Sequence, residues 1–219
     1  MPPSAPAPGQ PTGVFVCFEG GEGAGKSTQS RLLREALEAQ GREVVLTFEP
    51  GDTPVGAQLR RIVLSPETGD LSPRTEALIY AADKAEHVHA LVQPALARGA
   101  VVVTDRYVDS TLAYQGAGRA VTDADLAEVE RVARWATQDL RPHLTVVLDL
   151  DPAAGLARFE GRDRIEAEGP QFHERVRAAF LRMAAADPER YLVLDARAPV
   201  DEIAAAVTDR LAPLLAPQA

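Results

Sequence analysis

The sequence predicts an α/β domain built around a parallel β-sheet, and three observations support this prediction. Five short apolar runs alternate along the chain with longer segments of helical periodicity. This order is typical of parallel strands joined by right-handed helical crossovers. The runs are continuous, as expected for strands covered on both faces. A glycine-rich motif lies between the first run and the first helical pattern, at the end of a strand where α/β domains bind ligands.

The elements follow in order along the chain. The candidate strands are residues 14–18, 43–48, 101–105, 144–149 and 191–195. After the first strand, Leu33 and Leu37 belong to a helical repeat that Gly41 can stop. Further helical patterns cover residues 74–98, 123–138, 170–186 and 200–215. We therefore predict one domain over residues 14–215, preceded by a proline-rich, disordered tail over residues 1–13.

The glycine-rich motif reads G-x-x-x-x-G-K-S. Its residues are Gly20, Gly21, Glu22, Gly23, Ala24, Gly25, Lys26 and Ser27, and Thr28 follows. Glycines let the main chain curl around a polyphosphate with its N–H groups pointing inward, and the helix start adds the positive end of its dipole. Lys26 adds a mobile charge near the outer phosphates, and the Ser27 hydroxyl suits Mg²⁺. The motif predicts nucleotide binding.

Composition excludes several other classes of protein. A net charge of −9 argues against a general nucleic-acid binder, which needs a basic face. The sequence contains no run of about 18 apolar residues, so it predicts no membrane-spanning helix. The single cysteine, Cys17, lies in the first strand, where we expect a buried inert thiol, in keeping with a reducing compartment. We find no spacing typical of metal ligands and no nucleophile–base pair.

The chain contains only two lysines, Lys26 and Lys84, among 23 basic residues. Where lysine is kept, a point charge on a flexible stem can matter. Tyr80 precedes Lys84 by four residues, so both lie on one helix face. The pair could stack on a base and hydrogen-bond its carbonyl. An aromatic in the core with lysine outside fits the spacing equally well, and chance retention of Lys84 remains an alternative.

Two other segments could carry phosphate chemistry. Asp105 and Arg106 end the third strand, where an acid can hold Mg²⁺ and a guanidinium can grip phosphate. A surface ion pair is the alternative. Arg158, Arg162 and Arg164 lie in a charged segment that could form a closing flap over a transferring phosphoryl group. A solvated helix face is the alternative there. Residues 110–119 fit either a pocket lip or a helix end.

These segments together resemble thymidylate kinase of the bacterial type, from about residue 14 to residue 211. The matching stretches are residues 18–28, Glu49-Pro50-Gly51, residues 81–84, the stretch from Asp105 to Arg119, and residues 163–166. The resemblance implies transfer of the ATP γ-phosphoryl group to dTMP, giving dTDP and ADP, with Mg²⁺, in dTTP synthesis. It implies a P-loop NTPase-type five-stranded parallel sheet with helices on both faces, a lid at about residues 158–170, and a cytoplasmic homodimer.

The resemblance also implies residue roles. ATP would be bound by the loop from Gly20 to Thr28, and Mg²⁺ by Ser27 and Asp105. The catalytic set would be Lys26, Asp105, Arg106 and the lid arginine Arg162. The dTMP contacts would be Glu22, Glu49, Pro50, Tyr80, Lys84, Arg106, Ser110, Thr111, Tyr114 and Gln115. Among these, Glu22 would lie near the 3′-hydroxyl, Tyr80 would stack on the base, and Tyr114 would crowd out a 2′-hydroxyl.

Three features depart from the family pattern. Lys84 replaces the usual arginine at the thymine edge, Phe48 replaces an arginine before Glu49, and the lid is a few residues short. Because lysine cannot make a bidentate contact, we expect weaker or water-mediated reading of the base. Another P-loop kinase for nucleosides or nucleoside monophosphates is the alternative. A nucleotide switch is a weaker alternative, because the guanine-reading Asn-Lys-x-Asp tetrad is absent from the sequence.

Overall fold

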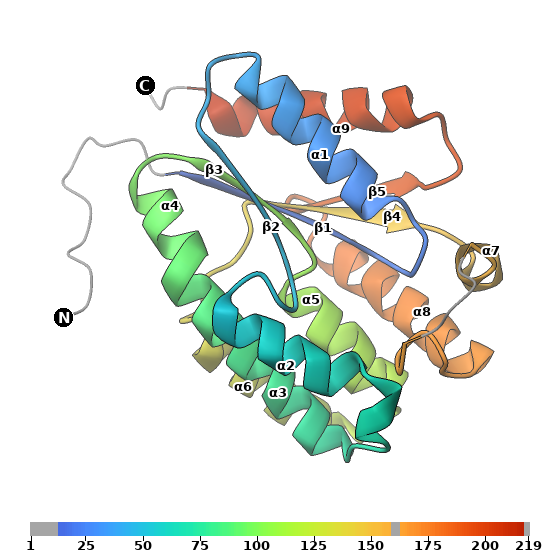
Figure 1. The fold of residues 1–219 in the computed structure, drawn as a ribbon. Helices are drawn as coiled ribbons and strands as arrows, with labels where there is room; N and C mark the ends of the chain where they lie inside the picture. The colour runs from blue at the N-terminus through green and yellow to red at the C-terminus, as the bar shows by residue number, and fades with distance from the viewer. Residues whose placement is uncertain (1–12, 159–162, 217–219) are drawn as a thin grey trace.

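A sheet of five parallel strands forms the centre of the protein in a computed structural model, which describes residues 13–158 and 163–216 (Figure 1). The strands are β1 (Val14–Gly20), β2 (Val44–Phe48), β3 (Val101–Asp105), β4 (Leu144–Asp149) and β5 (Tyr191–Asp195). Their order across the sheet is β2-β3-β1-β4-β5. This confirms the predicted fold class, and each strand lies within two residues of its predicted bounds.

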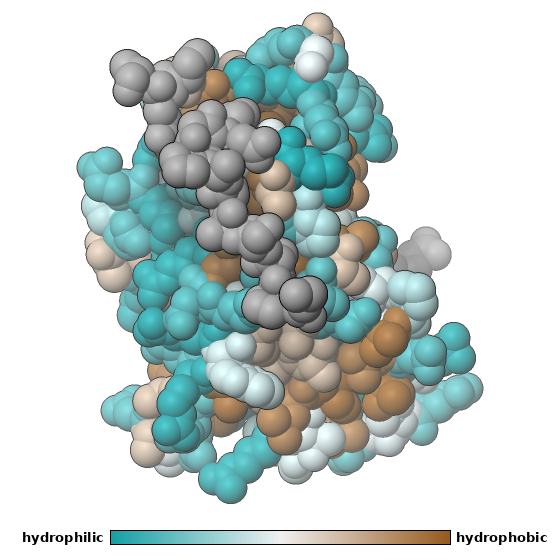
Figure 2. Space-filling view, turned by 90° about the vertical axis from the view of Figure 1, so that its left-hand side faces the viewer, coloured by the Kyte–Doolittle hydropathy of each residue, from teal (hydrophilic) through white to brown (hydrophobic). Residues whose placement is uncertain are grey.

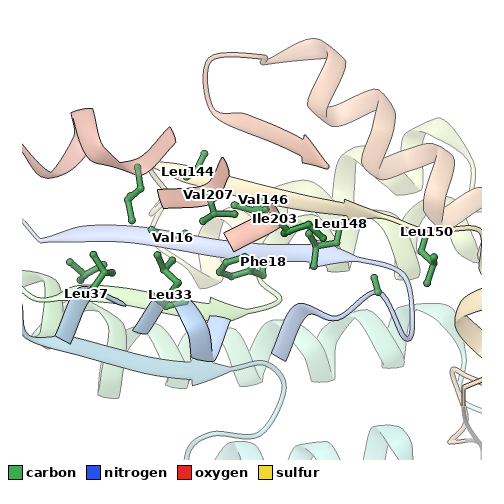
Figure 3. Close-up of a cluster of buried hydrophobic side chains, with 14 residues drawn as sticks. Val16, Phe18, Leu33, Leu37, Leu144, Val146, Leu148, Leu150, Ile203 and Val207 are labelled. Carbon is green, nitrogen blue, oxygen red and sulfur yellow. The ribbon is translucent and has the colours of Figure 1, made fainter. Parts of the chain in front are cut away.

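Helices α1 (Lys26–Glu38) and α9 (Val200–Leu215) cover one face of the sheet (Figure 1). Val16 and Phe18 of β1 point to this face and pack with Leu33 of α1 and Val207 of α9 (Figure 3). All four side chains are at most 3% exposed. Apolar burial of this kind is the main force that holds the layers together.

The alternate residues of β1 point to the opposite face. Phe15 and Cys17 pack there with Val88 and Tyr107, and Cys17 is buried as predicted. Helix α8 (Pro170–Ala186) covers the same face further along, where Phe180 packs with residues of β4 and β5. The sheet is therefore buried on both faces, as the continuous apolar runs predict. Helix α6 (Asp123–Ala136) lies outside this layer and contacts α3.

The helix predicted over residues 74–98 is interrupted, which corrects the sequence interpretation. Helix α3 (Pro73–His87) is followed by a π-helical turn, η2 (Val88–Val92), and by α4 (Gln93–Ala97). Pro94 has no N–H group and crowds the preceding turn of a regular helix. A wider π turn just before it accommodates this strain.

Several helices were not anticipated. Helix α2 (Pro54–Leu64) has proline at its first position and Thr53 as its N-cap residue. The Thr53 hydroxyl accepts a hydrogen bond from Gly56 N at 2.8 Å. The short helices η1 (Pro66–Thr68) and α7 (Pro152–Leu156) also begin with proline. Residues 110–119 are helical over most of their length, and Ser110, Thr111, Tyr114 and Gln115 among them line a cavity, which agrees with the predicted pocket lip. They continue α5 (Val108–Thr111) into the π-helical segment η3 (Leu112–Gly118).

The start of the domain differs slightly from the predicted boundary at residue 14. Gly13, placed at the end of the tail by the sequence, is buried, and its N–H donates to Leu96 O at 3.0 Å. Residues 1–12 of the predicted tail lie outside the described residues. Among the described helices, none is long and apolar enough to cross a membrane.

Candidate active site

The loop between β1 and α1 has the backbone that a phosphate cradle requires. Gly20, Gly23 and Gly25 adopt φ values of 133°, 69° and 93°, which residues other than glycine rarely adopt. A Cβ on Gly23 would lie 2.6 Å from Gly155 O. The loop ends where α1 begins at Lys26, so its N–H groups and the helix dipole favour an anion at this point.

Lys26 lies across this loop. Its Nζ donates to Gly20 O at 3.2 Å and to Gly21 O at 2.9 Å. Burial lowers the pKa of Lys26, and the nearby guanidinium of Arg106 lowers it further, while Glu22 acts in the opposite direction. A buried ammonium that donates to two neutral carbonyls keeps its charge uncompensated by hydrogen-bonded acids among the described residues, so it is well placed to bind a phosphate oxygen.

Ser27 and Asp105 meet at the mouth of the loop. The Ser27 hydroxyl donates to Asp105 Oδ2 at 2.7 Å, because β3 pairs with β1 in a register that sets Asp105 opposite Phe18. Hydroxyl and carboxylate oxygens are the donors that Mg²⁺ prefers. The described residues include no group of three His, Cys, Asp or Glu side chains able to hold a metal ion. Two protein oxygens fit Mg²⁺, which takes most ligands from phosphates and water.

A cavity next to the loop gathers the residues assigned to dTMP. All ten of them line it: Glu22, Glu49, Pro50, Tyr80, Lys84, Arg106, Ser110, Thr111, Tyr114 and Gln115. They come from four separate segments of the chain, at residues 22, 49–50, 80–84 and 106–115, which the fold brings together around one cavity. A second cavity contains Ser27, Asp105 and Arg106. Arg106 and Glu49 line both, so the two cavities adjoin.

Arg106 connects the phosphate loop to the cavity lined by these ten residues. Its Nη2 donates to Glu22 Oε1 at 2.6 Å, and its Nη1 donates to Gly20 O and to Ser110 Oγ, both at 3.2 Å. The residue adopts φ 73°, which is strained for arginine. Hydrogen bonds from Arg106 N to Phe18 O and from Thr104 Oγ1 to Arg106 O, both 2.9 Å long, fix this conformation.

Glu19 accepts hydrogen bonds from the residues that follow Arg106 and so stabilises the turn after β3. It is fully buried in β1, and its carboxylate accepts hydrogen bonds from Tyr107 N at 2.8 Å, Ser110 N at 3.1 Å and Ser110 Oγ at 2.6 Å. Burial raises the pKa of Glu19 to about 7, and the neighbouring Asp109 adds to this effect. Glu19 therefore fixes the start of α5 directly after Arg106.

Glu22 carries a negative charge at the boundary of the two cavities. Burial alone would raise its pKa, but Arg106 and then Lys26 outweigh burial and lower the pKa to about 2. Tyr114 OH donates to Glu22 Oε1 at 2.8 Å, and the Tyr114 ring lies 5.0 Å from the guanidinium carbon of Arg106. These contacts hold Glu22, Arg106 and Tyr114 as one rigid polar cluster.

Lys84 is buried, which excludes chance retention on an exposed helix face. It is 2% exposed, and its Nζ lies 2.9 Å from Glu49 Oε2 and 5.7 Å from the centroid of the Tyr80 ring. The alternative of a core aromatic with lysine outside is therefore wrong. His87, one turn further along, lies 2.7 Å from Glu49 Oε1 and 2.6 Å from Thr47 Oγ1.

Sequence reasoning missed several residues of the site. Arg60 of α2 lines both cavities, donates to Pro50 O at 2.7 Å and stacks on Phe48, 5.7 Å from its ring centroid. The helical pattern of α2 could have indicated it. Leu64, Asp163, Ile165 and Glu166 also line the cavity that holds the ten residues assigned to dTMP. His87 could have been found from its spacing to Lys84, but its acidic partner is 38 residues away.

Arg158 and Arg164, two of the three arginines predicted for the lid, contact different segments of the protein. Arg158 Nη1 donates to Gly23 O in the phosphate loop. Arg164 instead pairs with Glu76 at 3.3 Å and donates to Val63 O at 2.8 Å, away from the loop. Arg162, the predicted catalytic lid arginine, lies outside the described residues.

Comparisons with known proteins agree with this geometry. Residues 18–207 match the family model described as thymidylate kinase. The chain is 56% identical over 209 residues to a thymidylate kinase of Clavibacter sepedonicus, covering 94% of this chain and 97% of that relative. It is 55% identical over 203 residues to one of Cutibacterium acnes, covering 93% and 98%. A crystal structure of thymidylate kinase from Ehrlichia chaffeensis matches with a TM-score of 0.75 at 30% identity, covering 92% and 99%.

Proposed function

The chain belongs to the thymidylate kinase family and phosphorylates dTMP, and we propose that it does so by holding ATP on the β1–α1 loop and dTMP in the adjoining cavity. The observation that carries this proposal is the single cavity lined by all ten residues assigned to dTMP. Arg106 joins that cavity to the phosphate loop through Glu22 and Gly20. The donor and acceptor phosphates would therefore approach each other near Arg106.

ATP would bind with its phosphates in the loop from Gly20 to Thr28. The N–H groups of the loop and the start of α1 would hold the phosphates, and Lys26 would contact an outer oxygen. Charge that spreads over the transferring phosphoryl group would be stabilised by Lys26 and Arg106, which are already in place. Pre-positioned cations need no reorganisation during the reaction, so they lower the barrier.

The thymine base would lie against Tyr80, with Lys84 at its edge. Lys84 offers hydrogen-bond donors only, which suits a carbonyl oxygen of the base. The 5′-phosphate would lie beside Arg106, and the sugar beside Tyr114 and Glu22. Because the acceptor phosphate is already an anion, no strong base is needed, and positioning does most of the work. Closing the site would exclude water, which otherwise competes as acceptor.

We also propose that Mg²⁺ accompanies ATP at Ser27 and Asp105. The facing hydroxyl and carboxylate would hold the ion directly or through its water shell. When bound, Mg²⁺ neutralises charge on the phosphates. Arg162 would act from the lid, and turnover of Arg162→Ala equal to that of the wild type would contradict that role.

We propose a homodimer that pairs through α3 and α6. Ala77 and Leu78 of α3 face Val129 and Val132 of α6 across a shallow groove, and Leu78 is 58% exposed. Figure 2 shows hydrophobic residues gathered on the lower part of the molecule on this side. A second copy of the chain would cover this apolar surface. Leu78→Glu should give monomers in sedimentation, whereas an unchanged mass would contradict this interface.

The finer aspects of the function follow the same reasoning. We propose that the enzyme works in the cytoplasm, where nucleotides are made and used, and supplies dTTP synthesis. Its net charge of −9 favours small-molecule substrates over stable nucleic-acid binding.

A panel of acceptors tests the proposed function. Purified protein receives ATP and Mg²⁺ with dTMP, dUMP, dCMP, dGMP or thymidine, and ADP formation is measured. We expect dTMP to give the highest kcat/KM and ATP turnover to depend on an acceptor. A clear preference for another acceptor would indicate a different P-loop kinase. Turnover without any acceptor would indicate a nucleotide switch.

A further inference from the structure

Glu76 is a buried carboxylate beside the dTMP cavity that the mechanism above does not use. It lies in the first turn of α3 and is fully buried. Its Oε1 accepts hydrogen bonds from Gln115 Nε2 at 3.1 Å and from Arg119 Nε at 3.0 Å. Its Oε2 accepts from Arg119 Nη2 at 2.7 Å and from Arg164 Nη1 at 3.3 Å. The bidentate arginine compensates the buried charge and keeps Glu76 an acceptor.

This contact determines which way the Gln115 amide points. Gln115 is 2% exposed and lines the dTMP cavity. A side-chain amide has a donor end and an acceptor end, and a carboxylate can only accept. The NH₂ group of Gln115 must therefore face Glu76. Among the described residues, none donates a hydrogen bond to Gln115 Oε1, so the carbonyl oxygen remains available to a ligand.

We infer that Glu76 is a positioning residue that locks Gln115 with its carbonyl toward the nucleotide base, and that it thereby selects thymine and uracil over cytosine. Thymine and uracil carry an N3–H donor beside the O4 acceptor, whereas cytosine carries an N3 acceptor beside an N4 amino donor. An inward carbonyl at Gln115 and the ammonium of Lys84 match the first pattern and oppose the second. Glu76 itself lies behind Gln115, so its effect on selectivity is indirect.

The test measures kcat/KM of the intact enzyme for dTMP, dUMP and dCMP. In Glu76→Gln, residue 76 can donate as well as accept, so the Gln115 amide can turn over. We expect the preference for dTMP over dCMP to fall by about ten-fold or more. The preference for dTMP over dUMP should stay within about two-fold, because those bases differ only in the 5-methyl group. General loosening of the pocket would lower both preferences.

Two further variants make the test decisive. Arg164→Met removes one donor to Glu76 but leaves the bidentate Arg119, so the preference over dCMP should be retained whatever the effect on turnover. Gln115→Leu should remove the effect of Glu76→Gln, so that the double variant discriminates no worse than Gln115→Leu alone. If Glu76→Gln does not fold, Glu76→Asp replaces it, with a smaller fall expected from its shorter reach.

The inference rests on the proposed function, and the two can fail separately. Wild-type protein that does not phosphorylate dTMP overturns the proposed function. Wild-type protein that prefers dTMP, together with a folded Glu76 variant that keeps the full preference over dCMP, overturns the role of Glu76.

Discussion

The hydroxyl of Ser27 donates a 2.7 Å hydrogen bond to Asp105 Oδ2, although 78 residues separate the two along the chain. Pairing of β3 with β1 sets Asp105 beside the phosphate loop. Replacing the carboxylate by an amide removes the charge that would attract Mg²⁺ or its water shell. We expect Asp105→Asn to raise the Mg²⁺ concentration for half-maximal activity by about ten-fold or more. A titration with Mg²⁺ at saturating ATP measures this, and an unchanged midpoint would argue against the site.

Lys26 should matter for turnover and little for stability. Within the described part of the chain its ammonium donates to Gly20 O and Gly21 O, and alanine is a good residue for the first turn of a helix. We expect Lys26→Ala to lower kcat by about 10³-fold, because a charge next to the transferring group is lost. The free energy of unfolding should change by less than about 1 kcal/mol. A fall in activity that only follows unfolding would contradict this prediction.

Lys84 should be essential for stability, because it neutralises a buried partner. Burial alone would raise the pKa of the Glu49 carboxyl, but Lys84 and then His87 lower it below its usual value. Removing the Lys84 ammonium would therefore leave the buried negative charge of Glu49 with less compensation. Breaking a buried ion pair in this way costs about 3–5 kcal/mol. We expect this loss in Lys84→Met, measured by urea unfolding. Lys84→Arg keeps the charge and should lose much less.

Tyr114 should favour deoxyribose over ribose. Its ring packs edge-on against Phe172 and Phe180, which fixes its position beside Glu22. We expect Tyr114→Ala to narrow the preference for dTMP over the ribonucleotide of thymine by about ten-fold. Tyr114→Phe keeps the ring and loses only the hydrogen bond to Glu22, so it separates crowding by the ring from the role of the hydroxyl. Equal discrimination in Tyr114→Ala and wild type would exclude the role of the side chain.

Glu19 should make stability depend on pH. Its pKa is raised from 4.5 to about 7, so the native state binds this proton more tightly than the unfolded chain does. The resulting stability is fully present below pH 4.5 and is lost as the pH rises through about 7. Glu19→Gln mimics the protonated form and should gain stability relative to wild type between pH 5 and pH 7.5, by more than about 1 kcal/mol. Parallel curves of unfolding free energy against pH would contradict the shift.

The elements of the fold were predictable where their signals are local. The strands are uninterrupted apolar runs, and the loop from Gly20 to Ser27 is a continuous motif, so neither needs knowledge of distant residues. The break in the helix predicted over residues 74–98 was harder to predict from the sequence. Pro94 signals a break in the helix after residue 87, but the π turn that absorbs it depends on packing of Val88 and Val92 beneath the sheet.

The sequence by itself determined the fold class and the phosphate loop, because each is marked by residues adjacent in the chain, and its resemblance to a known family pointed to ten of the residues that line the dTMP cavity. Only the tertiary structure decided which side chains are partners. Lys84 meets Glu49, Arg106 meets Glu22, and Glu76 holds Gln115, across separations of 35 to 84 residues. Such pairs depend on strand order, register and the path of each helix, which bring distant segments together. Burial then gives these contacts their strength, because charges removed from water require partners.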